Sequence, residues 1–121
     1  MDELTELERL IIVEKGTEPP FSGQLNDKFD DGLYRCRQRR APLYLSEDKF
    51  DAFCGWPSFD NEIKNSIARK LDKDGVRVEI SCSGCGGHLG HVFEGEQLTA
   101  NNVRHCVNST SLIFESKYLN D

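Results

Sequence analysis

The stretch VRVEISCSGCGGHLGHVFEG, which runs from Val76 to Gly95, combines the clearest strand pattern with the densest group of chemically active side chains. VRVEI, residues 76–80, alternates apolar and charged residues, as a strand with one buried face does. HVFEG, residues 91–95, is a second strand candidate. The stretch therefore predicts two strands on either side of a segment rich in glycine, cysteine and histidine.

Cys82, Cys85, His88 and His91 recur at every third position of this stretch. The CxxC spacing is half of a tetrahedral metal site, and zinc normally takes four ligands. A single zinc site made of all four residues is the less favoured interpretation, because zinc ligands usually come as two separated pairs. The glycines argue against a helix, so both histidines are expected on a loop that enters a strand. Each histidine titrates near neutral pH and can protonate a reacting oxygen or activate a thiol.

The rest of the chain predicts a mainly β fold with antiparallel strands and short helices. Thr5 and Glu8 fit a capping box for one short helix, from about Glu6 to Gly16. Residues 16–32 are irregular and are expected to wrap over the core. Residues 61–71 fit either a helical turn or the first arm of a hairpin that turns at DKDG, residues 72–75. Further strand candidates are LYRC (33–36), APLYLS (41–46), VRHCVN (103–108) and SLIFES (111–116).

The composition is that of an ordinary soluble domain, and the 121 residues suit one domain, residues 1–121. The formal net charge of −6 argues against a nucleic-acid partner, and the basic run at residues 35–40 is expected to be a solvated hairpin tip. No apolar run reaches the roughly 18 residues of a membrane span, and MDELTELERL lacks a signal-peptide pattern, so we expect a cytoplasmic protein. An odd number of cysteines, 5, then points to thiol chemistry or metal binding.

Cys106, in VRHCVNSTSL, is the first candidate nucleophile. On a strand, its side chain would share a face with Arg104 and Asn108, while His105 points to the opposite face. A nearby guanidinium favours the reactive thiolate, and Asn108 can orient hydrogen bonds. A buried core cysteine is the other interpretation, and the residues alone leave both open.

Cys54, in FCGWPSF, lies beside Gly55 on a segment rich in chain-breaking residues. It could approach another thiol, although a disulfide needs Cα atoms within about 7 Å, a distance that a sequence does not supply. Trp56 could offer a flat wall to a small apolar group, or simply pack in the core.

The motifs GTEPPFSG, DGLYRC, CGWPSF, HLGHVFEG and RHCVNSTSL occur in the order found in the type B methionine sulfoxide reductases, which the chain resembles from about Gly16 to Phe114. The resemblance implies a mainly β fold of two coiled antiparallel sheets with short flanking helices. It also implies an enzyme that reduces methionine-R-sulfoxide in proteins, with thioredoxin or a similar dithiol as reductant. We expect a monomer that binds neither nucleic acid nor membranes.

Position by position, the resemblance assigns Cys106 as the catalytic nucleophile and Cys54 as the resolving cysteine. Cys106 would attack the sulfoxide sulfur and become a sulfenic acid, and Cys54 would then close a disulfide that the dithiol reopens. His91, assisted by His88, would donate protons to the sulfoxide oxygen. The other assigned residues are the active-site Asn108 and the substrate-binding Trp56, Phe93 and Arg104.

The chemistry itself is expected to need no cofactor, but many members of this family hold a structural zinc with two CxxC pairs. Cys82 and Cys85 match one pair, whereas the other keeps Cys36 and has Arg39 in place of its second cysteine. A guanidinium stays protonated and cannot bind zinc. Three outcomes are open: a three-cysteine site completed by water or another side chain, no metal, or an oxidised Cys82–Cys85 pair. We expect a weakened or absent zinc, and a further hypothesis pairs Arg39 with a residual thiolate.

Two other functions compete with the reductase. A non-enzymatic zinc-binding β module would use Cys36, Cys82 and Cys85, but Arg39 spoils its ligand set and it has no use for CGWPSF or HLGHVF. A thiol–disulfide oxidoreductase would use Cys82 and Cys85, yet that activity favours a CxxC at a helix N-terminus, whereas glycines flank this one.

Overall fold

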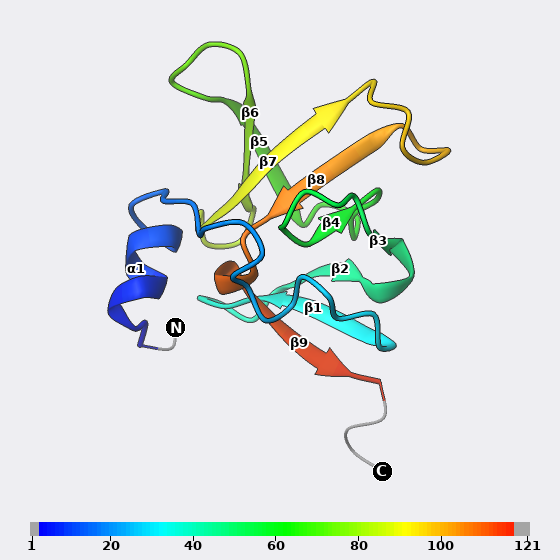
Figure 1. The fold of residues 1–121 in the computed structure, drawn as a ribbon. Coiled ribbons are helices and arrows are strands. Elements are labelled where there is room, and N and C mark those ends of the chain that lie inside the picture. The colour runs from blue at the N-terminus through cyan, green and yellow to red at the C-terminus, as the bar shows by residue number, and fades with distance from the viewer. Residues whose placement is uncertain (1–2, 118–121) are drawn as a thin grey trace.

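The chain folds into a three-stranded and a six-stranded antiparallel sheet in the computed structural model, which describes residues 3–117 (Figure 1). The strand order is β2-β1-β9 in the smaller sheet and β3-β4-β8-β7-β6-β5 in the larger one. The smaller sheet contains β1 (Gly32–Cys36), β2 (Pro42–Leu45) and β9 (Leu112–Ser116). The larger sheet contains β3 (Lys49–Phe50), β4 (Ser58–Phe59), β5 (Ile67–Leu71), β6 (Val78–Cys82), β7 (His88–Glu94) and β8 (Val103–Val107). The mainly β fold with two antiparallel sheets is therefore confirmed.

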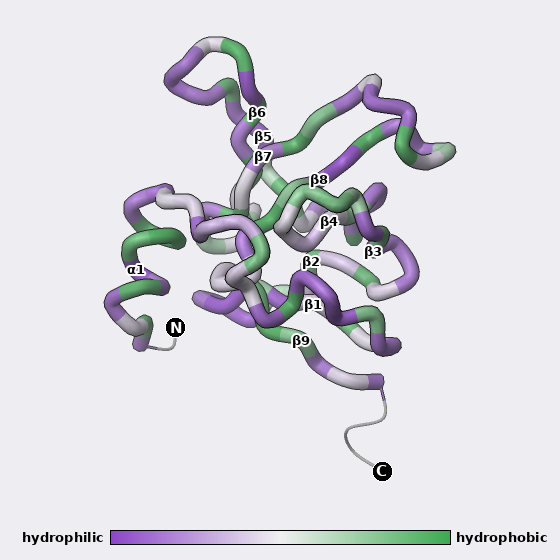
Figure 2. Tube along the Cα trace, viewed as in Figure 1, coloured by the Kyte–Doolittle hydropathy of each residue, from purple (hydrophilic) through white to green (hydrophobic). Residues whose placement is uncertain are grey.

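Helical structure in the described residues is limited to α1 (Glu6–Ile12) and the 3-10 turns η1 (Ser46–Asp48) and η2 (Ser109–Ser111). The predicted capping box is present, since the Thr5 hydroxyl accepts from Glu8 N at 3.2 Å and the Glu8 carboxylate accepts from Thr5 N at 2.8 Å. The helix ends at Ile12, four residues before the glycine expected to stop it. Along α1, hydrophobic and hydrophilic residues alternate (Figure 2), because one side of the helix is buried through Ile11 and Ile12.

An aromatic cluster joins the two sheets at the core. Phe59 of β4 stacks on Tyr44 of β2 with ring centroids 4.2 Å apart, and it meets Tyr34 of β1 edge to face at 5.0 Å. All three rings are fully buried, as are Leu43, Ile80 and Val107. Burying aromatic rings of this size against both sheets supplies much of the apolar contact that holds one sheet on the other.

The segment around DKDG is a β-hairpin. Residues 67–71 form β5, which pairs with β6 from Ile67 opposite Cys82 to Leu71 opposite Val78. The tip is closed by a hydrogen bond of 2.9 Å from Gly75 N to Asp72 O. The hairpin alternative is therefore right and the helical alternative wrong, and the hairpin tip projects from the body of the molecule (Figure 1).

The next strand corrects a prediction about the two histidines. β7 begins at His88, so both His88 and His91 lie on the strand and not on a loop before it. Pairing with β6 on one side and β8 on the other keeps this glycine-rich segment extended. Cross-strand hydrogen bonds here outweigh the weak strand preference of glycine.

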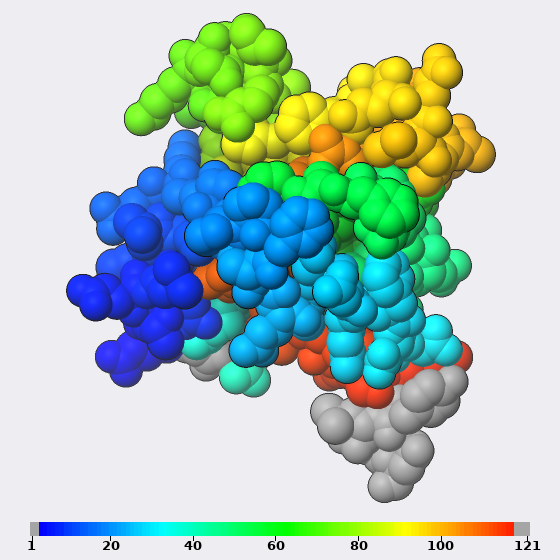
Figure 3. Space-filling model, in the orientation of Figure 1, coloured from blue at the N-terminus to red at the C-terminus, as the bar shows by residue number. Residues whose placement is uncertain are grey.

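Residues 13–31 contain no helix or strand and pass across the face of the molecule, as expected for an irregular wrapping segment (Figure 3). Phe21 N donates to Gly55 O at 2.7 Å, and Leu25 N donates to the Ser109 hydroxyl at 2.9 Å. The segment is thus attached to both the β3–β4 loop and η2. Among the described residues, no helix has the length and apolar character needed to cross a membrane.

Candidate active site

A pocket of about 150 Å³ lies where the 13–31 segment and the β3–β4 loop meet strands β7 and β8. Two of the five cysteines, Cys54 and Cys106, line it. The other lining residues are Thr17, Trp56, Arg77, Gly90, His91, Phe93, Arg104, Val107 and Asn108. The structure therefore gathers, from five separate segments, all the sequence-predicted active-site residues except His88.

Strand register brings the side chains predicted to be catalytic together. Cys106 of β8 lies opposite His91 of β7, and Arg104 lies opposite Phe93. The predicted split of faces on β8 is confirmed, because His105 points away from the pocket and shares a 2.8 Å hydrogen bond with the Tyr44 hydroxyl. Residue 90 must be glycine for this register, since a Cβ there would overlap the carbonyl oxygen of Cys106.

Cys54 sits on the β3–β4 loop, and its thiol has three polar neighbours. Its sulfur lies 3.5 Å from the Ser58 hydroxyl, and the same 3.5 Å separates it from the Trp56 carbonyl and from Arg104 Nη1. Gly55, the next residue, has a φ of +94°, a conformation that glycine adopts without strain.

The two thiols interact, and their pKa values move in opposite directions. The hydrogen bond from Cys106 lowers the pKa of Cys54 to about 5, with smaller help from Ser58 and Arg104 against the effect of burial. The same hydrogen bond, together with burial, raises the pKa of Cys106. At neutral pH the pair therefore carries one negative charge on two adjoining sulfurs, beside a guanidinium.

Arg104 is fixed from two sides. Glu96 accepts a bidentate pair of hydrogen bonds from Nε at 2.8 Å and Nη2 at 3.2 Å, and the guanidinium carbon lies 4.6 Å from the centre of the Phe93 ring. Such bidentate pairs restrict the guanidinium in orientation as well as position. Phe93 thus both lines the pocket and supports the cation that faces Cys54.

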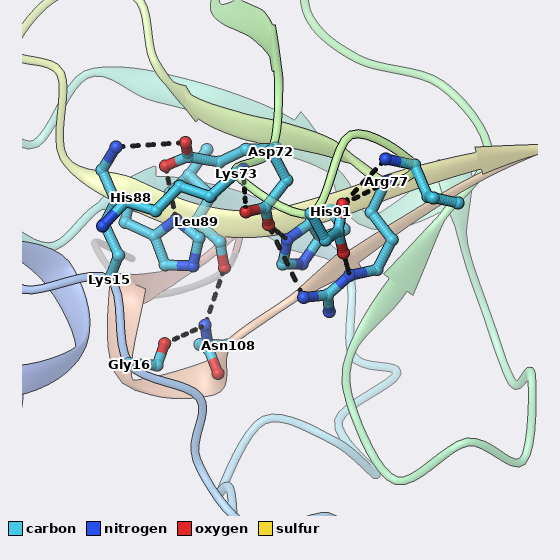
Figure 4. Close-up of polar contacts among 12 residues, drawn as sticks. Lys15, Gly16, Asp72, Lys73, Arg77, His88, Leu89, His91 and Asn108 are labelled. Atoms are coloured by element: carbon cyan, nitrogen blue, oxygen red, sulfur yellow. Dashed lines mark hydrogen bonds and ion pairs between the residues drawn. The ribbon is translucent and has the colours of Figure 1, made fainter.

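Each histidine of β7 has its own carboxylate (Figure 4). His91 Nε2 lies 2.6 Å from Asp72 Oδ2, and this hydrogen bond lowers the pKa of Asp72. His88 Nδ1 lies 2.8 Å from Glu79 Oε2, and Lys15 donates to the same carboxylate at 3.3 Å.

His88 lies behind the pocket and not at its wall. Its ring centroid is 5.8 Å from that of His91, and it lines a neighbouring polar pocket on the other side of His91. Only 3% of its surface is exposed, and burial lowers its pKa, so the ring is neutral at pH 7. A buried neutral histidine in this position supports His91 but does not touch the space next to Cys106.

Asn108 ties the wrapping segment to β7. Its amide oxygen accepts from Glu18 N at 2.9 Å, and its amide nitrogen donates to Leu89 O at 3.1 Å and to Gly16 O at 3.5 Å. Trp56 fixes the same segment, since Nε1 donates to Glu18 O at 2.9 Å. These bonds hold the segment that contributes Thr17 to the pocket wall.

The SelR domain family model matches residues 4–116, nearly the whole chain. The chain belongs to the SelR domain family. It is 53% identical to the chloroplastic peptide methionine sulfoxide reductase B2 of Arabidopsis thaliana over 86% of this chain and 52% of that protein. It is 52% identical to peptide methionine sulfoxide reductase B5 of Oryza sativa subsp. japonica over 83% of this chain and 74% of that protein. The predicted resemblance to type B methionine sulfoxide reductases is thereby confirmed.

The SelR domain chain spans about half the length of the first of these relatives. Among solved structures, the Yippee-like domain of Mis18 is similar, with a TM-score of 0.54 and 15% identity over 72% of this chain and 97% of that one. At this identity the likeness concerns the fold alone.

This member of the SelR domain family also has a cluster of three thiols outside the pocket. Cys36 ends β1, Cys82 ends β6, and Cys85 follows in the β6–β7 turn; their sulfurs lie within 4.8 Å of one another. Cys36 Sγ and Cys85 Sγ are 3.6 Å apart. Two thiolates on one tetrahedral zinc lie about 3.8 Å apart, because each Zn–S bond is about 2.3 Å. The donor set therefore fits a metal ion that prefers sulfur, and a zinc there would join the two sheets.

The basic run of the β1–β2 hairpin differs from prediction in its contacts. Arg39 Nη1 donates to the carbonyl oxygen of Gly84 at 3.0 Å, a main-chain contact, and its pairing with a residual thiolate stays a hypothesis. Arg37 pairs with Glu8 of α1 at 2.7 Å, and Arg35 pairs with Glu115 of β9 at 3.1 Å. The run therefore packs onto its neighbours and is not merely a solvated tip.

Sequence reasoning missed the acidic residues of the site. The sequence pattern places Asp72 only in a turn and Glu79 only on the polar face of a strand, and it places Glu96 in no element. Each contacts a basic side chain from another strand, so its role depends on register. The sequence contains several acidic residues near the two histidines and Arg104. Their number alone does not show which acidic residue pairs with which basic one.

Proposed function

We propose that this chain reduces methionine-R-sulfoxide in proteins to methionine, with Cys106 as the nucleophile. The observation that carries the proposal is the pairing of Cys106 with Cys54 in one pocket beside Arg104 and His91. Family membership supports the reaction, since the relatives are named peptide methionine sulfoxide reductases.

In the first step, the Cys54 thiolate accepts the proton of Cys106 as the Cys106 sulfur attacks the sulfoxide sulfur. The negative charge moves to the attacking atom while Arg104 remains beside it. His91 donates a proton to the sulfoxide oxygen, and Asp72 stabilises the imidazolium. The oxygen passes from the methionine sulfur, which gains two electrons, to the Cys106 sulfur, which loses two. The products are methionine and a Cys106 sulfenic acid.

In the second step, Cys54 attacks the sulfenic sulfur, and a Cys54–Cys106 disulfide forms with the loss of water. An external dithiol then reduces this disulfide by exchange and is itself oxidised to a disulfide. Thioredoxin or a similar dithiol protein is the reductant we infer. The exposure of the Cys54 loop favours such access, since Phe53 beside it is 83% exposed.

The pocket walls suit the methyl and methylene groups of methionine sulfoxide. Trp56 and Phe93 supply apolar surface, and Arg104 supplies a cation near the reacting sulfurs. Asn108 acts as a positioning residue, because its amide is already bound to main-chain groups on two segments. His88 is a positioning residue for His91, through the buried pair with Glu79.

The alternative of a non-enzymatic zinc-binding β module rests on Cys36, Cys82 and Cys85, which lie outside the pocket. The cluster and the pocket use different cysteines, so a structural metal and the reductase activity are compatible. An oxidoreductase based on Cys82 and Cys85 is less favoured, because this pair lies at a strand end and not at a helix N-terminus. We propose a cytoplasmic monomer, while two relatives are named as chloroplastic.

The test is reduction of R- against S-methionine sulfoxide by the full chain, with either a small dithiol or thioredoxin. The R epimer alone should be reduced. Cys106→Ser should abolish turnover with both reductants, and Cys54→Ser should abolish turnover with thioredoxin. Ser83→Ala, which changes an exposed hydroxyl outside both the pocket and the thiol cluster, is the control and should keep activity. Reduction of the R-sulfoxide by Cys106→Ser would contradict the proposal.

A further inference from the structure

Gln38 lies next to Cys85 of the three-thiol cluster. It belongs to the turn between β1 and β2, two residues after Cys36, and its side chain is half-buried. Its amide oxygen is 3.7 Å from Cys85 Sγ. The same oxygen lies close to Gly87, where a Cβ would come within 2.9 Å of it, so it is directed at the β6–β7 turn that carries Cys85.

These separations match those expected between ligands of a single ion. For a tetrahedral zinc with Zn–S near 2.3 Å and Zn–O near 2.1 Å, a sulfur and an oxygen ligand lie about 3.6 Å apart and two sulfurs about 3.8 Å apart. The Cys85–Gln38 and Cys36–Cys85 distances are 3.7 Å and 3.6 Å. Cys82 completes the set, because all three sulfurs lie within 4.8 Å of one another.

Arg39, the next residue, is directed elsewhere. Its guanidinium donates to the carbonyl oxygen of Gly84 at 3.0 Å, and the side chain is exposed. The turn therefore presents the neutral oxygen donor of Gln38 to the thiols and keeps the cation of Arg39 on the outer side of the β6–β7 turn.

We propose that the Gln38 amide oxygen is the fourth ligand of a metal site formed with Cys36, Cys82 and Cys85, and that the site takes a thiophilic divalent cation such as Zn²⁺. The three thiols bind as thiolates and release their protons, whereas the amide binds without losing one. The ion with three thiolates carries a net charge of −1, and Arg39 on the adjoining carbonyl brings a compensating positive charge. A neutral oxygen ligand and a nearby arginine together explain how a chain without a fourth cysteine keeps the cluster ordered.

The ion would connect the two sheets from outside the catalytic pocket. Cys36 and Gln38 come from the β1–β2 hairpin of the smaller sheet, and Cys82 and Cys85 come from β6 and its turn in the larger one. The proposal is independent of the proposed reductase function, because none of its four ligands lines the pocket.

The experiment is a titration of the full chain, stripped of metal and kept reduced, with Zn²⁺ against a chromophoric chelator. Co²⁺ serves as a second probe, since its absorption reports the number of thiolate ligands and the coordination geometry. We expect one equivalent of Zn²⁺ per chain and a Co²⁺ spectrum of three thiolates. Gln38→Ala should weaken Zn²⁺ binding by on the order of ten- to a hundredfold and change the Co²⁺ ligand-field bands.

Arg39→Ala is the matched control on the same turn, and it should bind Zn²⁺ at least as tightly as the unchanged chain because it removes a positive charge. Gln38→Glu keeps an oxygen at the site and should bind Zn²⁺ more tightly than Gln38→Ala. The proposal is overturned if the unchanged chain binds no Zn²⁺, if Gln38→Ala binds it as tightly as the unchanged chain, or if Gln38→Glu binds no better than Gln38→Ala. Circular dichroism of the metal-free forms checks that each variant folds.

Discussion

Arg104 Nη1 lies 3.5 Å from the sulfur of Cys54, the thiol assigned to the resolving step. Glu96 and the Phe93 ring hold the guanidinium in this place. In the proposed mechanism, the resting negative charge of the pair lies on Cys54, where Arg104 stabilises it, and Cys54 acts as the base that activates Cys106. One residue then takes part in both halves of the proposed cycle.

The pKa of Cys54 should depend more on Cys106 than on Arg104. The hydrogen bond from Cys106 is the largest cause of the pKa of about 5, so Cys106→Ala should move this pKa upward, toward that of an ordinary cysteine. Arg104→Leu should raise it by a smaller amount. The measurement is the pH dependence of alkylation at Cys54, followed on its own peptide by mass spectrometry. Cys106→Ser keeps a hydroxyl donor and is the control. An equal pH midpoint of Cys54 alkylation in Cys106→Ala and in the unchanged chain would rule out this coupling between the two thiols.

Asp72 should contribute to turnover through His91. Asp72→Asn removes the carboxylate 2.6 Å from His91 Nε2 and with it the stabilisation of the imidazolium. We expect kcat for the R-sulfoxide to fall on the order of ten- to a hundredfold, with little change in KM.

Asp74→Asn is the matched control for this change. Asp74 lies in the same turn, but its carboxylate accepts from Arg77 at 2.8 Å and not from His91. Its variant should keep kcat within a few-fold of the unchanged chain. Equal losses in the two variants would mean that the turn as a whole, and not the carboxylate on His91, is responsible.

His105 should make the fold sensitive to mild acid. Burial lowers its pKa to about 4 from 6.5, with Tyr44, Glu62 and Arg69 around the ring. Because the folded pKa is depressed, the unfolded chain binds the proton first, and stability is lost as pH falls from about 6.5 toward 4. The loss from this residue is about 3 kcal/mol over that range.

Urea unfolding at pH 7 and pH 4.5 measures this effect. His105→Gln keeps a hydrogen-bonding group for Tyr44 but does not titrate, so its stability should fall less between the two pH values than that of the unchanged chain. Parallel losses in both proteins would show that other groups, and not His105, cause the acid sensitivity.

Gly90→Ala should disrupt the register that aligns His91 with Cys106. The added methyl group would overlap the Cys106 carbonyl oxygen, a main-chain atom that cannot move aside without shifting β8. We expect a loss of about 3 kcal/mol in the free energy of unfolding and a strong loss of activity. Gly84→Ala is the control, because the atoms nearest to its added methyl group would be 3.7 Å away. Thermal melts of both variants should show a clear difference in stability between them.

The two faces of β8 could be predicted because they follow from local alternation of side chains along a strand. In VRHCVN the two-residue period alone places Arg104 with Cys106 and His105 on the other side, whatever the strand pairs with. The structure adds what each face meets, the pocket on one side and Tyr44 on the other.

Contacts that depend on pairing between distant segments could not be predicted. The glycines around His88 suggested a loop, but pairing with β6 and β8 makes the segment a strand, and Gly90 is required there by the closeness of Cys106. Asp72 had the pattern of a turn residue, and only the register of the hairpin brings it to His91. The proximity of Cys54 to Cys106, 52 positions apart in the printed sequence, likewise comes from the β3–β4 loop and not from spacing.

The bond between Glu18 N and the Asn108 side chain joins residues 90 positions apart. One wall of the Cys54–Cys106 pocket therefore forms only after almost the entire chain has been synthesised and β8 is in place. Contacts of such long sequence separation form late in folding, because the intervening loop must close first. A nascent or partly unfolded chain thus carries both thiols before it has the pocket, and the proposed selectivity for methionine sulfoxide would appear only with the completed fold.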